Sequence, residues 1–158
     1  MLSVAVSYLY IGVTTFLLGF GVKIFVKKYL DYEIAKVTSL IYAGLGMATV
    51  YAGIYSLFSG VSLGANIGML LLCTGVILKG KEELFSFWEQ QKRELTKWKI
   101  GFGVILFLIF AYGGSRGYLH FDSGLYHAQA IRWIEEYGVV PGLANLHCRL
   151  AYNSSAFV

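Results

Sequence analysis

Charged residues are missing from three long stretches of this chain, and their distribution constrains the fold more than any other feature. No Asp, Glu, Lys or Arg occurs in residues 1–22, 37–78 or 100–115, which are runs of 22, 42 and 16 residues. The hydrocarbon core of a bilayer is about 30 Å thick and a helix rises about 1.5 Å per residue, so one span needs about 20 residues. The three runs therefore predict an all-α, polytopic membrane protein.

The 42-residue run is long enough for two helices, and small and polar residues gather near its middle, at residues 59–66. Only 14% of the residues are charged, against about 25% in soluble domains, so the chain lacks the hydrophilic surface that a soluble helix bundle needs. No basic residue precedes the first apolar run, which argues against a cleaved signal peptide. We therefore expect about four spans within residues 1–112, at residues 3–25, 37–58, 63–78 and 98–112.

Basic residues indicate the orientation of these spans. Ten of the 13 Lys and Arg residues lie in residues 23–36 and 79–99, whereas residues 59–66 contain none. Because positively charged loops stay in the cytoplasm, both basic segments are predicted inside, and the N-terminus and residues 113–158 outside. The net charge of +4 follows this topology, so no nucleic-acid partner is expected.

The second basic segment also has the pattern of an amphipathic helix. Its apolar residues recur at helical spacing over residues 82–97. Trp88 and Trp98 have the amphipathic rings that favour the headgroup boundary. We therefore predict a cytoplasmic helix that lies along the membrane surface and contacts membrane lipids.

Residues 113–158, called the polar segment below, differ in composition from the spans. They hold all three histidines and the only proline of the chain. We expect an extracytoplasmic loop containing a surface helix from Asp122 or Ser123 to about Tyr137, which ends at Gly138. Asp122 then begins the helix, either as a cap of the free backbone N–H groups or as a general base at the headgroup level.

Other polar residues of this segment allow several sites. His120, Asp122 and His127 could hold a divalent metal, but no second cluster completes the site, so we expect no cofactor. Arg149 could bind an anionic group such as a phosphate, or extend to lipid headgroups. Cys73 lies in a span and Cys148 outside, so no intrachain disulfide is expected.

Small residues recur every four positions in two of the predicted spans. This spacing allows helices to approach closely, so it predicts helix packing rather than a ligand site. The residues are Gly44, Ala48 and Ala52 in one series, and Gly60, Gly64 and Gly68 in the other.

The polar segment resembles a signature of large bacterial membrane proteins that look like C-type (GT-C) glycosyltransferases. The similarity covers about 35 residues, 121–155, and depends most on FDSGLYHAQ at 121–129 and WIEEYGVVPGLANLH at 133–147. The chain has Cys148 where the family pattern has glycine. GT-C proteins have more spans than four, so the resemblance also implies that this chain is the N-terminal part of a longer protein.

The resemblance implies a function and a set of site residues. GT-C enzymes transfer a sugar from a polyprenyl-phosphate donor to a glycan or lipid acceptor outside the bacterial cytoplasmic membrane. Asp122 matches the acidic residue that is taken as their catalytic base. The residues that would line the same substrate cavity are Tyr126, His127, Asn145, His147 and Arg149.

Two other classes of function stay open. A non-enzymatic membrane protein, acting as an assembly or export partner, would use Asp122 only as a helix cap. A transporter is less favoured, because no charged residue lies within the three apolar runs, where coupling sites occur.

Overall fold

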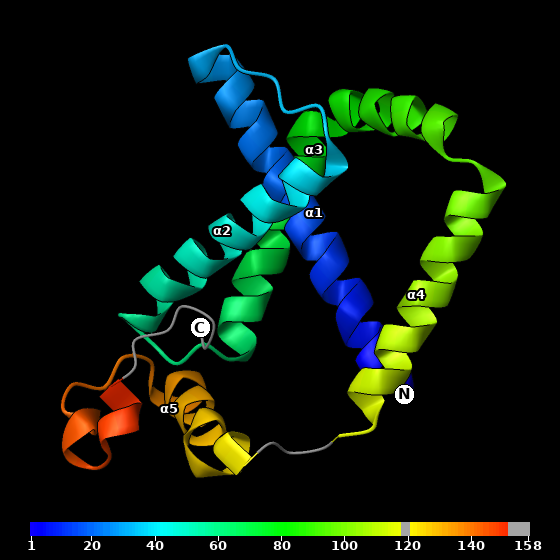
Figure 1. The fold of residues 1–158 in the computed structure, drawn as a ribbon. Coiled ribbons are helices and arrows are strands. Elements are labelled where there is room, and N and C mark those ends of the chain that lie inside the picture. The colour runs from blue at the N-terminus through cyan, green and yellow to red at the C-terminus, as the bar shows by residue number, and fades with distance from the viewer. Residues whose placement is uncertain (118–120, 152–158) are drawn as a thin grey trace. The chain divides into compact units, whose positions relative to one another are not determined.

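The computed structural model describes residues 1–117 and 121–151 (Figure 1). All regular secondary structure in these residues is helical. Within the described residues, four helices are long and apolar enough to cross a membrane: α1 (Leu2–Leu30), α2 (Val37–Ser56), α3 (Leu63–Glu94) and α4 (Lys97–Ser115). The prediction of an all-α polytopic membrane protein with four spans is confirmed.

The observed helices extend beyond the charge-free runs at several ends. α1 continues through Lys27 and Lys28 to Leu30, and it stops where Asp31 takes a left-handed backbone conformation with φ 51°. α4 begins at Lys97, before its charge-free run, and it ends with that run at Ser115, three residues past the predicted end of its span. Charge marks where a helix leaves the hydrocarbon, whereas backbone geometry decides where the helix ends.

α3 contains both the third span and the predicted amphipathic helix. Gly80 interrupts it with non-helical dihedral angles, φ −108° and ψ 16°. The ribbon changes direction at this point (Figure 1). The predicted boundary at residue 97 is wrong: α3 ends at Glu94, Thr96 is extended, and Lys97 already belongs to α4.

The described residues divide into two compact units. The first unit contains Met1–Gly44 and Cys73–Gly117. The second contains Leu45–Leu72 and the described residues that follow Gly117.

A small aromatic core holds the first unit together. Phe20, Leu40 and Phe87 are buried, and the ring centroids of Phe20 and Phe87 are 5.9 Å apart. Lys23 is buried beside them, with its ammonium 4.7 Å from the centroid of the Phe87 ring. The same ammonium lies 3.5 Å from a carboxylate oxygen of Glu33, which offsets part of the cost of burying the charge.

Glycines allow α1 and α2 to pack with their backbones in contact. A Cβ atom on Gly19 would overlap the Leu40 carbonyl, and one on Gly44 would overlap the Thr15 carbonyl. Gly46, two residues further along α2, faces open space. The predicted packing role of Gly44 is therefore confirmed.

In the second unit, the other glycine series packs against tyrosines of α2. A Cβ atom on Gly64 would lie 2.7 Å from the Tyr55 hydroxyl oxygen, and Gly68 faces the Tyr51 hydroxyl. That Tyr51 hydroxyl donates a 2.8 Å hydrogen bond to the Ala65 carbonyl. These glycines therefore make room for the tyrosine side chains of α2, and a close approach of the two helix backbones stays a prediction.

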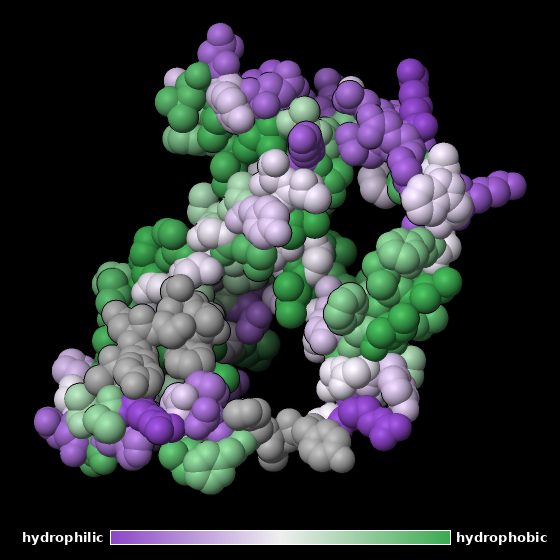
Figure 2. Space-filling view, viewed as in Figure 1, coloured by the Kyte–Doolittle hydropathy of each residue, from purple (hydrophilic) through white to green (hydrophobic). Residues whose placement is uncertain are grey.

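Apolar side chains cover most of α4 and face outward. Figure 2 shows hydrophobic residues over the length of this helix and hydrophilic residues at both ends. Ala111 is its one buried residue, whereas Ile105 and Phe110 are exposed. This distribution is the one expected of a helix in contact with lipid.

Candidate functional site

The polar segment forms a helix with an irregular start. Residues Ser123–His127 make a π-helical turn, η1, and α5 (Ala128–Tyr137) follows without a break. Gly138 ends α5 with φ 73°, as its position predicts. Two short 3₁₀ turns come next, η2 (Leu143–Asn145) and η3 (Cys148–Ala151).

The end of α5 docks against the turn that joins α2 to α3. The Val139 N–H donates a 2.8 Å hydrogen bond to the Ser56 carbonyl, and the Val61 N–H donates a 2.9 Å bond to the Ile134 carbonyl. Gly60 lies at the centre of the contact, where a Cβ atom would come within 2.7 Å of the Glu136 carbonyl oxygen. These main-chain contacts join two segments that the charge pattern had placed on the same side of the membrane.

Asp122 and Arg149, which lie near the two ends of residues 121–151, form an ion pair. Arg149 Nη1 lies 3.1 Å from Asp122 Oδ1, although 27 residues separate them in the sequence. The Arg149 side chain is 41% exposed and the Asp122 side chain is 35% exposed. The guanidinium carbon also lies 5.1 Å from the centroid of the Tyr126 ring. Three residues predicted to share a site are therefore neighbours.

The interpretation of Asp122 as a helix cap is wrong. Its backbone is already helical, with φ −65° and ψ −27°, and its carboxylate makes no capping hydrogen bond. The carboxylate pairs with Arg149 instead. A cap needs a non-helical backbone so that its side chain can reach the N–H groups of the first turn.

His127 and His147 each contact one member of the group formed by Asp122, Tyr126 and Arg149. His147 Nδ1 accepts a 3.2 Å hydrogen bond from the Arg149 backbone N–H. A neutral His147 ring must therefore carry its proton on Nε2. The His127 ring lies 4.2 Å from the Tyr126 ring, centroid to centroid.

Asn145 is the one predicted site residue that the described contacts do not connect to this group. It lies on η2 with an exposed side chain, and its backbone N–H donates a 2.9 Å hydrogen bond to the Gly142 carbonyl. Its predicted role in substrate binding stays a prediction.

The other candidate sites involve cysteine and metal ligands. Cys73 is buried and Cys148 exposed, and both thiols are free. His120, part of the alternative metal site, lies outside the described residues. Within residues 1–117 and 121–151, no group of three or more His, Cys, Asp or Glu could hold a metal ion.

The exposed side of α5 carries a small pocket in addition to the residues predicted from the sequence. Arg132 Nε and Glu136 Oε1 are 2.8 Å apart, and the Trp133 and Tyr137 ring centroids are 5.1 Å apart. With Gln129, these residues line a cavity of about 160 Å³. The i, i+4 spacing of both pairs on one helix would have identified them.

The hydrogen bond from Arg132 lowers the pKa of Glu136 from its ordinary value, and it raises the pKa of Arg132. We therefore expect Arg132→Gln to raise the pKa of Glu136, measured by carbon NMR of the labelled carboxyl group. A depressed carboxyl pKa stabilises the folded state above the unfolded pKa, and the contribution is lost as pH falls through the folded pKa. Because both groups are exposed to water, the effect on stability is small. Arg149→Gln removes a charge of the same sign that pairs with Asp122 instead, and it should leave the pKa of Glu136 unchanged.

Comparison with known proteins gives a family. DUF8201, described as a domain of unknown function, matches residues 1–158. No match was found among curated proteins or solved structures. Both compact units and the Asp122–Arg149 pair fall inside the matched residues. Because the match spans the whole sequence, the chain belongs to the DUF8201 family.

Proposed function

We propose that this chain belongs to a membrane glycosyltransferase of the GT-C class, which transfers a sugar from a polyprenyl-phosphate donor to a glycan or lipid acceptor. The observation that carries the proposal is the partly exposed Asp122 carboxylate, held beside the Arg149 guanidinium and the Tyr126 ring. The resemblance of residues 121–155 to the GT-C signature supports the same assignment.

Asp122 would act as the general base. Its carboxylate would accept the proton of an acceptor hydroxyl group, whose oxygen attacks the anomeric carbon of the donor sugar. The bond between that carbon and the phosphate oxygen breaks, and polyprenyl phosphate leaves with the electron pair. This single displacement inverts the anomeric configuration.

Arg149 would hold the phosphate of the donor next to the base. A guanidinium has five N–H donors in a planar fork, and a phosphate can accept two of them at once. Among the described residues, Asp122 is the one carboxylate that engages this guanidinium. A phosphate bound there would compete with Asp122 Oδ1 for the guanidinium.

A second candidate is a non-enzymatic assembly or export partner. The ion pair favours this candidate, because the contact between Asp122 and Arg149 closes residues 122–149 into a loop and so gives both residues a structural role that needs no catalysis. Here Asp122 would be needed for its charge and not for proton transfer.

The two candidate functions predict different results in a sugar-transfer assay. Membranes from cells that express the full-length protein would receive radiolabelled polyprenyl-phosphate sugars, and label in extracted glycan and lipid would be counted. We expect incorporation above that of membranes from cells without the gene, and its loss in Asp122→Asn. Equal incorporation with and without the protein, across the available sugars, would contradict the enzymatic proposal.

The proposal also needs the polar segment to lie outside the bacterial cytoplasmic membrane. Cys148 is exposed and Cys73 buried, so a membrane-impermeant maleimide should label Cys148 in intact cells. Cys148→Ser should abolish the labelling. Labelling that requires cell lysis would reverse the orientation and exclude an extracytoplasmic site.

A further inference from the structure

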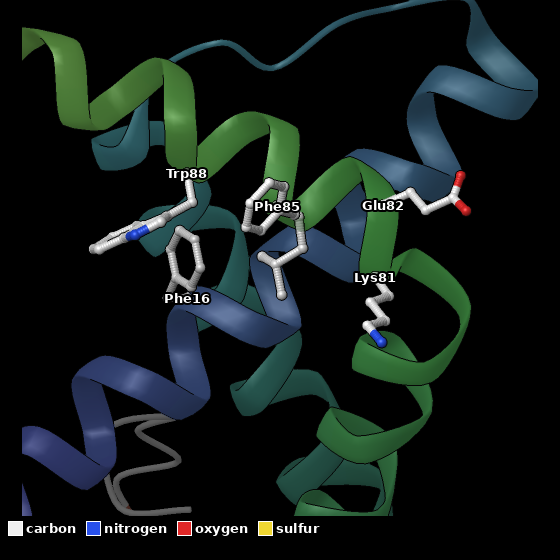
Figure 3. A pocket seen from close by; sticks show the side chains of 6 residues that line it. Phe16, Lys81, Glu82, Phe85 and Trp88 are labelled. Carbon is white, nitrogen blue, oxygen red and sulfur yellow. The ribbon is translucent and has the colours of Figure 1, made fainter.

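We propose that the first unit binds an anionic phospholipid of the bilayer in a groove between α1 and the part of α3 that follows Gly80. The groove has a volume of about 660 Å³. This volume lies within the range of about 300–1,000 Å³ that is typical of small-molecule sites. Its lining residues are Phe16, Lys81, Glu82, Leu84, Phe85 and Trp88 (Figure 3).

The two ends of the groove differ in polarity. Figure 3 shows the rings of Phe16, Phe85 and Trp88 gathered at one end, with Lys81 and Glu82 at the other. Phe85 is 67% exposed and Trp88 is 49% exposed, although both belong to types that favour apolar surroundings. An occupant with an apolar chain and a charged head matches this arrangement.

The charged end carries the Lys81 ammonium and the Glu82 carboxylate. Lys81 makes no ion pair with any described residue, whereas Lys23 and Lys92 pair with Glu33 and Glu89. The carboxylate of Glu82 points away from the aromatic rings (Figure 3). The Lys81 ammonium is therefore the polar group that a ligand in the groove would meet, and it favours an anionic head.

The charged end of the groove falls where α3 leaves its predicted span, which is where lipid headgroups are expected. The charge-free run 37–78 ends at Leu78, three residues before Lys81, and Trp88 has the ring type that favours this boundary. Basic pockets between membrane helices bind anionic headgroups, while the long stems of lysines remain in apolar surroundings. A zwitterionic lipid would place its own cation near the Lys81 ammonium, and the repulsion between the two cations would weaken its binding.

The test is lipid retention measured by native mass spectrometry of the purified chain in the presence of phosphatidylglycerol or phosphatidylcholine with matched acyl chains. We expect more phosphatidylglycerol adduct than phosphatidylcholine adduct. Lys81→Gln should weaken phosphatidylglycerol binding about fivefold, the factor that corresponds to one lysine contact with an anionic lipid surface. Lys97→Gln removes the same charge from α4, outside the groove, and should have no such effect.

A second arm tests the apolar end. Trp88→Ala should weaken binding of both lipids, and glycerol phosphate, which has the head without the chains, should not displace phosphatidylglycerol. Equal retention of the two lipids, or equal effects of Lys81→Gln and Lys97→Gln, would overturn the proposal. If glycerol phosphate displaced phosphatidylglycerol, the site would bind a phosphate group without the need for acyl chains.

Discussion

Replacing Asp122 by asparagine is expected to slow sugar transfer by about 10²- to 10⁴-fold, the range that a general base contributes. The amide has almost the shape of the carboxylate but cannot accept the proton of the acceptor hydroxyl group. Loss of the ion pair itself should cost about 1 kcal/mol of stability or less, because both side chains are partly exposed. The measurement is the initial rate of label transfer, normalised to the amount of protein in the membrane.

Two further variants separate chemistry from structure. Glu135→Gln removes an exposed carboxylate from the same unit, and transfer should be unchanged. The exchange Asp122→Arg with Arg149→Asp restores an ion pair between the two positions but moves the carboxylate. If Asp122 is the base, the exchanged protein should stay inactive, whereas recovery of function would assign the pair a structural role.

Gly60→Ala is expected to separate the α2–α3 turn from the end of α5. The added Cβ atom would collide with the backbone of Glu135 and Glu136, which cannot rotate away as a side chain can. Overpacking of this kind typically costs about 1–3 kcal/mol, and a collision with backbone belongs at the upper end. The backbone amides of Val61 and Val139, which cross this contact, should exchange with deuterium faster.

Gly53→Ala is the matched control, because this position on α2 faces open space within the same unit. It should leave amide exchange unchanged. Equal protection of Val61 and Val139 in the Gly60 variant would mean that the two segments do not depend on this close approach.

The four spans could be predicted from the sequence because hydrocarbon thickness and the cost of burying charge act on composition alone. Residues 37–78 show this well, since their length and the small residues at 59–66 were enough to divide them into α2 and α3. The end of α5 was also predictable, because Gly138 has a positive φ that few other residues adopt.

Features that depend on distant partners could not be predicted in the same way. Asp122 has the sequence context of a cap, and only the approach of Arg149, 27 residues later, makes it an ion-pair partner. The docking of the α2–α3 turn rests on main-chain hydrogen bonds, which no residue type reveals. The bend at Gly80 was hidden because glycine is also common in straight membrane helices.

The buried Lys23 has a consequence for how α1 can move. Its ammonium is enclosed by the rings of Phe20 and Phe87 and by Glu33, at one end of a helix that is otherwise apolar before this residue. Sliding α1 by one turn, about 5.4 Å, away from that end would pull the charge off the Phe87 ring of α3 and into hydrocarbon, whereas Phe20, which is on α1 itself, would move with it. The Lys23 contacts thus limit the movement of α1 along its own axis, whereas the glycine contacts with α2 limit its rotation and tilt.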